Sequence, residues 1–217
     1  ARREAILIDA GKEGFGPSMS QDDINALIVE HAQAGAQVVR LKGGDPYVFG
    51  RGGEEVLTLK QHHIDFEVVP GVTAASGCSA YSGIPLTHRG LSRSVQFITG
   101  HFSNDEPLDI DWHKVADPKT TLVIYMGLAN LEYICTSLIA AGLPASTPAA
   151  AIQNGTSGNQ QRVISKLDRL TGAISSKGLT APVMIIIGTV VSLADELDWF
   201  QYTLEESSYD KNSVAHN

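Results

Sequence analysis

The chain has 217 residues, of which 43% are hydrophobic, and a net charge of −8 at pH 7. This length is sufficient for one large domain or two small ones, each with a hydrophobic core. The acidic charge argues against non-specific nucleic-acid binding, which depends on Lys and Arg at phosphates. The longest apolar run, residues 183–187, is far shorter than the roughly 20 residues of a membrane-spanning helix, so we expect a soluble, cytoplasmic protein.

Three strand patterns alternate with three helix patterns in the first part of the chain. Short apolar, β-branched runs predict strands at residues 5–9, 38–41 and 66–69, and shared apolar faces predict helices at residues 20–34, 54–59 and 73–81. The first helix has the clearest boundaries, because Ser20 and Asp23 form a capping-box pattern and Gly35 follows its last turn. The alternation predicts a parallel sheet with helices on its faces.

A glycine-rich stretch follows the second predicted strand. Gly43-Gly44-Asp45-Pro46 ends that strand, and three further glycines lead into the next helix. Adjacent glycines adopt backbone angles that other residues resist and let a ligand approach the main chain, while Pro46 stops a strand ladder from continuing. Taken alone, these four residues fit a ligand-binding loop and an ordinary turn equally well.

Residues 83–90 interrupt the alternation with Gly, Pro and polar residues, and we therefore place a domain boundary there. The predicted domains are residues 1–92 and residues 93–217. In the second, we expect strands at residues 94–99, 122–127, 149–152, 163–164 and 183–187, and helices at residues 131–141 and 167–176. In both halves, predicted strands end in glycine-bearing loops, which is where open α/β sheets bind ligands. A ligand cleft between the two domains is therefore expected.

The sequence predicts no metal site. It contains no His-Glu-x-x-His, no Cys-x-x-Cys and no Gly-x-Ser-x-Gly, which excludes the minimal motifs of several metalloproteases, zinc ribbons and serine hydrolases. Cys78 and Cys135 have no partner at metal-ligand spacing and are expected to be reduced and inert. The adjacent His62 and His63 fit the solvated end of a helix better than a metal pair, because neighbouring helical residues point about 100° apart.

Four segments carry the resemblance to a known family. Residues 38–55, 69–77, 83–89 and 98–101 include Arg-Leu-Lys-Gly-Gly-Asp-Pro, Pro-Gly-Val-Thr, Gly-Ile-Pro-Leu-Thr-His-Arg and Ile-Thr-Gly-His. With these motifs the chain resembles the uroporphyrinogen-III C-methyltransferases of the tetrapyrrole methylase superfamily. The resemblance implies an α/β fold of two αβα domains, with S-adenosyl-L-methionine in the cleft between them and a homodimer as the assembly.

The resemblance also implies a set of cofactor-binding residues. In the order of the chain they are Gly43, Gly44, Asp45, Val48, Thr73, Ala74, Met126 and Gly155. Glycine backbone can approach a ligand closely, and the free amides at the helix start after Thr73 favour a carboxylate. For Met126, the alternative is a core methionine without a role in binding.

The implied reaction methylates C2 and C7 of uroporphyrinogen III to give precorrin-2, a precursor of sirohaem and cobalamin, and S-adenosyl-L-homocysteine leaves. A sulfonium methyl group is already electrophilic and the pyrrole is electron-rich, so the protein mainly aligns the reacting atoms and excludes water, and no metal is required. By resemblance, Lys12 occupies the position of a catalytic proton donor. Without the motif, it reads as a surface lysine in a flexible loop.

The polycarboxylate substrate requires local cations in this acidic protein. Residues 38–93 carry six bases against five acids, whereas residues 194–217 carry one base against six acids. Charge-assisted hydrogen bonds to carboxylates contribute about 1.5–3 kcal/mol each. We expect the substrate-binding set to be Arg40, Arg51, His88 and Arg89, although any of them could instead be an internal ion-pair partner.

The chain departs from the family pattern at its start. The family's opening strand, its Gly-x-Gly-x-Gly-Asp-type loop and the Asp of a Tyr-Asp segment have no counterpart here, and roughly forty to fifty residues are expected to be missing. We therefore expect this chain alone to bind the cofactor weakly or not at all. Two alternatives stay open: another superfamily methylase, acting on ribosomal RNA or in the diphthamide pathway, and a non-catalytic fragment. The sequence also leaves open a fusion to a dehydrogenase-chelatase and the choice between sirohaem and cobalamin.

Overall fold

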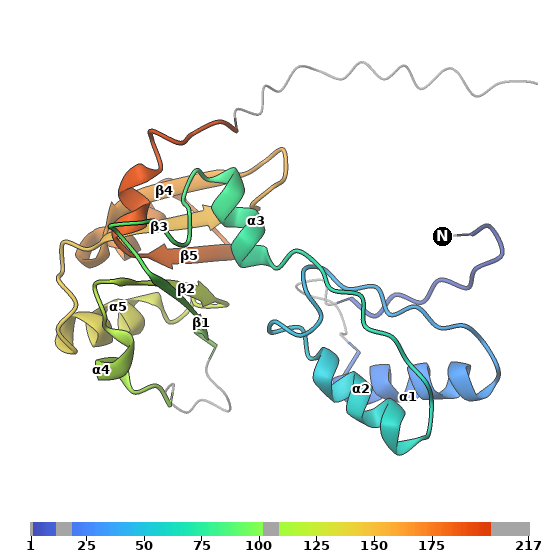
Figure 1. The fold of residues 1–217 in the computed structure, drawn as a ribbon. Helices are drawn as coiled ribbons and strands as arrows, with labels where there is room; N and C mark the ends of the chain where they lie inside the picture. Colours follow the sequence, from blue (N-terminus) through green and yellow to red (C-terminus); the bar gives the residue numbers. More distant parts are fainter. Residues whose placement is uncertain (1, 12–18, 102–108, 201–217) are drawn as a thin grey trace, which may run out of the picture. The chain divides into compact units, whose positions relative to one another are not determined.

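The computed structural model describes residues 2–11, 19–101 and 109–200 (Figure 1). It divides into two compact units, Ala1–Thr73 and Ala74–Asn217, called unit 1 and unit 2 below. In the described ranges, every helix is too short or too polar to cross a bilayer.

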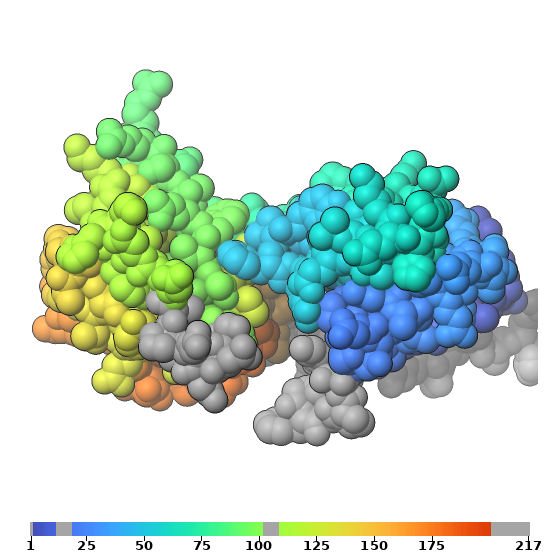
Figure 2. All heavy atoms as spheres, turned by 90° about the horizontal axis from the view of Figure 1, so that it is seen from below, coloured from blue at the N-terminus to red at the C-terminus, as the bar shows by residue number. Residues whose placement is uncertain are grey.

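Unit 1 contains two helices, α1 (Gln21–Gln33) and α2 (Gly52–Gln61). The predicted capping box of α1 is confirmed: the Asp23 amide donates to Ser20 Oγ at 3.1 Å, and the Ser20 amide donates to Asp23 Oδ2 at 3.2 Å. Asn25 of α1 donates to the Thr58 hydroxyl of α2 at 3.2 Å. Figure 2 shows the atoms of these two segments in direct contact.

The three strands predicted for unit 1 are wrong. Residues 5–9, 38–41 and 66–69 form no strand, and the backbone hydrogen bonds of the described residues do not join them. Their apolar side chains are correspondingly exposed, for example Ile6 at 81%, Val39 at 80% and Leu41 at 83%. An apolar, β-branched run predicts only that a segment suits a sheet, whereas a strand exists only when a neighbour pairs with its backbone.

Unit 2 is built on a five-stranded sheet, and every strand predicted for this region is confirmed. The strands are β1 (Ser94–Thr99), β2 (Thr120–Tyr125), β3 (Pro148–Gln153), β4 (Gln161–Lys166) and β5 (Val183–Ile187). Their order in the sheet is β1-β2-β5-β3-β4. Strands β1 and β2 are parallel, whereas β5 runs antiparallel to both β2 and β3, and β4 runs antiparallel to β3. The sheet is therefore mixed rather than parallel, because β3 and β4 are joined by a loop and not by a helix.

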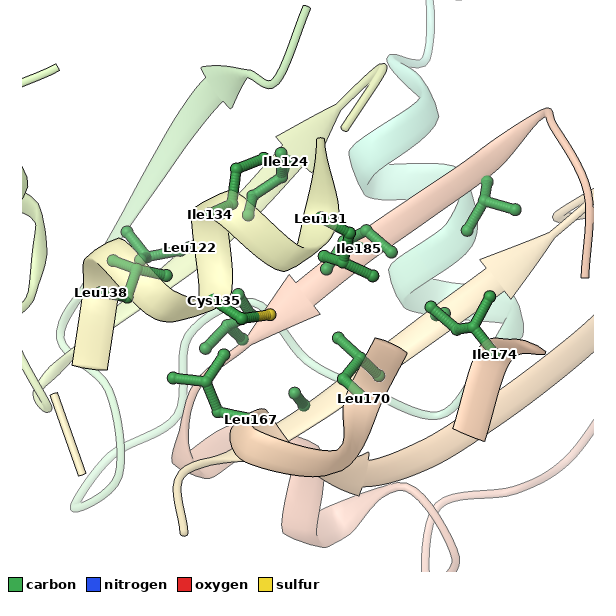
Figure 3. Packing of buried hydrophobic residues seen from close by; sticks show 14 of the residues in the cluster. Leu122, Ile124, Leu131, Ile134, Cys135, Leu138, Leu167, Leu170, Ile174 and Ile185 are labelled. Atoms are coloured by element: carbon green, nitrogen blue, oxygen red, sulfur yellow. The ribbon is translucent and has the colours of Figure 1, made fainter. Parts of the chain in front are cut away.

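Helices cover both faces of this sheet. On one face, α5 (Leu131–Ala140) and α6 (Leu170–Lys177), with the 3₁₀ turn η1 (Leu167–Arg169), pack on β2, β3 and β5 (Figure 3). This packing forms the main core, in which Ile124, Ile134 and Leu170 are fully buried. The short helix α4 (Trp112–Val115) borders α5. The other face carries α3 (Ala74–Tyr81) and the 3₁₀ turn η2 (Thr189–Leu193).

The connection between α3 and β1 belongs to unit 2. Ile84 in this connection is fully buried, and Ser92 Oγ donates to the Lys119 carbonyl at 3.2 Å. The contacts of the chain thus change at residue 74. The domain boundary between residues 92 and 93, placed from the Gly, Pro and polar residues at positions 83–90, stays a prediction.

The sheet of unit 2 gathers three strand ends on one edge. Strands β2 and β3 are both antiparallel to β5, and β1 is parallel to β2, so β1, β2 and β3 end at the same edge. We call this the carboxyl edge. Just beyond it, Met126, Asn154 and Thr156 have positive φ angles of 54°, 48° and 71°. Such angles are uncommon outside glycine and concentrate at functional sites.

Candidate functional site

In unit 1, the Gly-Gly-Asp-Pro loop is closed by the carboxylate of Asp45. Asp45 Oδ1 accepts the Tyr47 amide at 2.8 Å, and Oδ2 accepts the Gly71 amide at 3.1 Å. Both hydrogen bonds hold the pKa of the Asp45 carboxyl below its usual value, and the bond from the Gly71 amide has the larger effect. The loop after Leu41 is therefore joined to the Pro-Gly-Val-Thr segment, which lies 26 positions further along the chain.

Two glycine positions of unit 1 leave no room for a side chain. A Cβ added at Gly71 would overlap the carbonyl oxygen of Gly44, and a Cβ at Gly52 would come within 2.6 Å of the Pro46 carbonyl oxygen. The Gly52 amide donates to that same Pro46 carbonyl at 2.9 Å, so the glycine cluster folds back over the loop before α2 begins. Of the predicted cofactor-binding residues, Gly43, Gly44, Asp45 and Val48 lie together in this loop, and Thr73 follows Gly71 by two positions.

Two of the four predicted substrate-binding residues are engaged by acids of unit 1. Arg40 Nε lies 3.2 Å from Glu55 Oε1, to which Lys42 Nζ also donates at 2.8 Å. Arg51 forms a bidentate pair with Glu54, in which Nε donates to Oε1 at 2.9 Å and Nη2 donates to Oε2 at 2.6 Å. Arg40 therefore serves as an internal ion-pair partner, which was the open alternative, while the Arg51 pair is half exposed.

The other two predicted substrate-binding residues, His88 and Arg89, lie in unit 2. They occupy an exposed turn that is closed by two backbone hydrogen bonds between His88 and Ser92, at 2.9 and 3.0 Å. Within the described ranges, neither side chain forms an ion pair. Arg89 is thus the predicted arginine whose charge is not already used by a described acid.

Replacing Glu55 with glutamine should destabilise unit 1 by about 1–3 kcal/mol. The Glu55 side chain is only 7% exposed, and it bonds Arg40, Lys42 and, at 3.3 Å, Gln21 of α1. Its loss would leave the 12%-exposed Lys42 ammonium without its anionic partner. Amide hydrogen exchange in α1 and α2 measures the effect. The matched control is Glu54→Gln, whose exposed pair with Arg51 contributes about 0–1 kcal/mol; equal exchange in the two variants would contradict the prediction.

In unit 2, α3 lies against the carboxyl edge and brings three predicted residues together. The Ala75 amide donates to the Tyr125 hydroxyl at 3.0 Å, and Tyr125 directly precedes Met126. A Cβ added at Gly155 would overlap Cys78 Sγ in the middle of α3. Ala74 thus begins α3 beside Tyr125 and Met126, and Gly155 packs against the middle of the helix.

Met126 is not a core methionine. Its side chain is 53% exposed, and its φ of 54° turns the chain sharply at the end of β2. The alternative considered from the sequence is therefore excluded. A left-handed backbone at a non-glycine residue costs of order 1 kcal/mol or more and persists where the surroundings impose it. The binding role of Met126 stays a prediction.

Sequence reasoning missed the residues that support the carboxyl edge. The expectation of free amides at the start of α3 is corrected at Ala75, whose amide is taken by the Tyr125 hydroxyl. Asn130 Nδ2 donates to the Gly100 carbonyl at 2.7 Å, and a Cβ at Gly100 would overlap Gly127 Cα, so the turns after β1 and β2 are tightly packed. Tyr125 could have been suspected because it precedes Met126; the role of Asn130 had no local signal.

The remaining predictions for the site concern a lysine and a metal. Lys12, the predicted proton donor, lies outside the described residues. In the part of the chain that the structure describes, no three His, Cys, Asp or Glu side chains are grouped so that they could hold a metal ion.

Both cysteines should resist alkylation in the folded chain. Burial raises the pKa of the Cys78 and Cys135 thiols to about 11. Since the thiolate is the nucleophile, nearly all of each thiol is protonated and unreactive at pH 8. We expect iodoacetamide to label neither residue appreciably at pH 8, and both after unfolding in urea, as measured by peptide mass spectrometry. Rapid labelling of the folded chain would contradict this prediction.

Comparison with known proteins gives a consistent match. The family model for tetrapyrrole (corrin/porphyrin) methylases matches residues 3–171. A siroheme synthase of Chromobacterium violaceum is 48% identical over 200 residues, covering 92% of this chain and 42% of that protein. Siroheme synthase 2 of Yersinia enterocolitica is 52% identical over 199 residues, covering 92% of this chain and 41% of that protein. The chain thus spans less than half the length of these curated relatives.

Solved structures show the same similarity. The uroporphyrin-III C-methyl transferase from Thermus thermophilus, complexed with S-adenyl homocysteine, is 38% identical, with a TM-score of 0.67 over 79% of this chain and 74% of that one. A cobalt precorrin-4 methyltransferase has a TM-score of 0.72 over 81% of this chain and 73% of that one. Its identity is only 23%, so it shows the fold alone.

Proposed function

Because this chain belongs to the tetrapyrrole methylase family, to which the match over residues 3–171 assigns it, we propose that it transfers methyl groups from S-adenosyl-L-methionine to C2 and C7 of uroporphyrinogen III. The product is precorrin-2, and the chain serves sirohaem or cobalamin biosynthesis. The observation that carries the proposal is the 38% identity with a uroporphyrin-III C-methyl transferase that binds the demethylated cofactor.

The residues present fit the cofactor. In unit 1, the Asp45-closed loop offers bare glycine backbone at Gly43 and Gly44, both exposed. In unit 2, the exposed Met126 follows Tyr125, which bonds the start of α3, and the sterically required Gly155 packs against the middle of that helix. Open main chain and a soft thioether suit a ligand that combines an adenosine, a sulfonium and an amino acid. We propose that Val48, Thr73 and Ala74 complete this set.

Orientation and exclusion of water are the protein's main tasks in this reaction. When bound, S-adenosyl-L-methionine supplies an electrophilic methyl group; a C–C bond forms at the pyrrole carbon as the C–S bond breaks, and the pyrrole releases a proton. The left-handed turn at Met126 and the close packing of Gly155 on α3 preorganise one wall of the site. We propose Lys12 as a catalytic proton donor in this reaction.

For the substrate carboxylates, Arg89 and His88 are the stronger candidates of the proposed set. Both side chains are exposed and make no ion pair within the described ranges, whereas Arg40 and Arg51 already contact Glu55 and Glu54. Using Arg40 for the substrate would first require separating it from a buried carboxylate. Arg51 is half exposed, so a substrate carboxylate could compete with Glu54 for it.

The test is formation of precorrin-2 from uroporphyrinogen III and S-adenosyl-L-methionine, followed by absorbance and mass spectrometry. Two proteins are compared: the 217-residue chain, and the same chain carrying the strand and glycine loop with which the family pattern opens. We expect methylation from at least one of these two forms. Absence of methylation from both would overturn the proposed function and favour the non-catalytic alternative.

The competing substrates receive less support. A diphthine synthase has a TM-score of 0.53 but only 16% identity, so its likeness concerns the fold alone. The acidic net charge of −8 also disfavours ribosomal RNA as a substrate. We propose a cytoplasmic homodimer as the working form, which size-exclusion chromatography with light scattering would test for the assembly.

A further inference from the structure

The C-terminal end of α3 is held by three side chains that the proposed mechanism does not use. Trp199 Nε1 donates to the Ala80 carbonyl at 2.8 Å, Gln160 Nε2 to the Tyr81 carbonyl at 2.9 Å, and Arg162 Nη1 to the Ser82 carbonyl at 2.7 Å. Three successive carbonyls are thus each bonded by a side chain from elsewhere in the sequence. We call these three donors the α3 clamp.

The clamp completes the hydrogen bonding of the helix end. The last carbonyls of any helix lack partners within the helix. In α3, the Cys78 and Ser79 carbonyls accept the backbone amides of Ser82 and Ile84, at 3.0 and 3.1 Å, and the next three carbonyls are those bonded by the clamp. Without the clamp, the carbonyls of Ala80, Tyr81 and Ser82 would lose these side-chain partners at the end of an eight-residue helix.

Arg162 is the centre of the clamp. Besides Ser82, its Nη1 donates to the Ala194 carbonyl at 3.2 Å, and its Nη2 contacts Asp195 and Asp198 at 3.2 and 2.9 Å. Its side chain is only 21% exposed, and its positive charge lies at the negative end of the α3 dipole. Asp195 is 88% exposed, so its pair with Arg162 is well solvated, whereas Asp198 is 36% exposed and forms the closer pair.

The opposite end of α3 lies at the proposed cofactor site. There the Ala75 amide meets the Tyr125 hydroxyl, while Cys78 packs on Gly155 halfway along the helix. Figure 1 shows α3 beside the loop that joins β3 to β4, the loop that ends at Gln160. An eight-residue helix is only about 12 Å long, and its backbone hydrogen bonds link its two ends. We therefore expect a displacement at Ser82 to shift Ala74 and Ala75 as well.

We propose that Arg162 is a positioning residue for the cofactor: by fixing the C-terminal end of α3, it sets the position of the helix start that faces S-adenosyl-L-methionine. This inference rests on the proposed function and deepens it. It assigns a role in the site to β4 and to the segment after η2.

The test uses two substitutions of Arg162. Arg162→Met keeps a long side chain and removes the hydrogen-bond donors, and Arg162→Lys retains the positive charge but not the planar guanidinium group. Arg169→Met is the matched control, because this substitution removes the same charge from an exposed arginine. Binding of S-adenosyl-L-homocysteine is measured by calorimetry, and steady-state kinetics separate KM from kcat. All variants are made in whichever protein form binds this ligand in the wild type.

We expect Arg162→Met to raise the dissociation constant of S-adenosyl-L-homocysteine and the KM for S-adenosyl-L-methionine about tenfold, as the loss of one charge-assisted contact would. The kcat and the KM for the tetrapyrrole should change little, and Arg162→Lys should recover part of the affinity. A purely structural role would lower the active fraction without changing the affinity of the folded protein. That result, or an equal effect of Arg169→Met, would overturn the proposal.

Hydrogen exchange separates this proposal from the proposed function. In Arg162→Met, the amides of residues 74–81 should exchange faster than in the wild type, with no ligand present. Unchanged exchange there would overturn the positioning role even if the enzyme is active. Wild-type protein that binds no S-adenosyl-L-homocysteine in either form would instead overturn the proposed function, and the positioning role with it.

Discussion

Replacing Gly155 with alanine should abolish tight cofactor binding and destabilise unit 2 by about 1–3 kcal/mol. The added methyl group would overlap Cys78 Sγ, which is buried in α3. Because Gly155 has no positive φ, its backbone accepts alanine, and the clash with Cys78 is the main obstacle. Either the loop after β3 or α3 must move, and both border the proposed cofactor site. Thermal unfolding and S-adenosyl-L-homocysteine titration measure the two effects, in the protein form whose wild type binds this ligand.

A compensating substitution makes this prediction specific. Removing the sulfur with Cys78→Ala leaves the Cys78 Cβ at 3.4 Å from the new methyl group, which is close to ordinary contact. The double variant should therefore recover most of the stability and affinity that Gly155→Ala loses, and should resemble Cys78→Ala alone. If the double variant is as impaired as Gly155→Ala, the contact with Cys78 is not the cause.

The parts of the fold that the sequence predicts correctly are those fixed by local pattern plus burial. The continuous apolar run at Val183–Ile187 is the central strand β5, and Ser20 with Asp23 begins α1 as predicted. The same apolar pattern failed at residues 38–41, where Val39 is 80% exposed. The difference is non-local: β5 pairs with both β2 and β3, whereas residues 38–41 pair with no described segment.

In the candidate site too, the sequence indicates the residues that belong to a local motif and gives no signal for contacts between distant residues. Motifs drew attention to Gly43 and Gly155, because a loop that needs bare backbone leaves glycines in the sequence, and their role in binding stays a prediction. They did not predict that Arg40 is held by Glu55, since nothing local distinguishes a ligand-binding arginine from one that neutralises a buried acid 15 positions away. Nor did they predict Arg162, whose carbonyl partner Ser82 lies 80 positions earlier.

In unit 1, the Asp45-closed loop keeps its hydrogen bonds although the segments around it form no sheet. The strand-like segments around it are unpaired, yet Asp45 accepts the Tyr47 amide within the loop and joins the loop to Gly71 through one further hydrogen bond. The pKa of Asp45 is lowered by these bonds, so their contribution is fully present above the ordinary carboxyl pKa of about 3.9 and is lost as the pH falls through the lower folded value. At neutral pH, Asp45 is therefore ionised, and its hydrogen bonds to the Tyr47 and Gly71 amides contribute fully to the stability of the loop.

Replacing Gly71 with alanine should remove cofactor binding more completely than any other single methyl group in unit 1. The new Cβ would overlap the Gly44 carbonyl oxygen and lie 3.5 Å from Asp45 Cα. Its nearest neighbours are backbone atoms, so no side chain can rotate away, unlike the sulfur at Gly155. The segment must separate from the loop, which breaks the hydrogen bond from the Gly71 amide to Asp45.

We expect S-adenosyl-L-homocysteine affinity in Gly71→Ala to fall by at least about a hundredfold, the equivalent of about 2.8 kcal/mol, with α1 and α2 still folded by hydrogen exchange. The matched control is Gly53→Ala, where nothing lies within 4 Å of the added Cβ. An alanine inside α2 should be neutral or stabilising by up to about 1 kcal/mol. If Gly71→Ala binds as tightly as Gly53→Ala, the junction between the Gly-Gly-Asp-Pro loop and the Pro-Gly-Val-Thr segment is not part of the cofactor site.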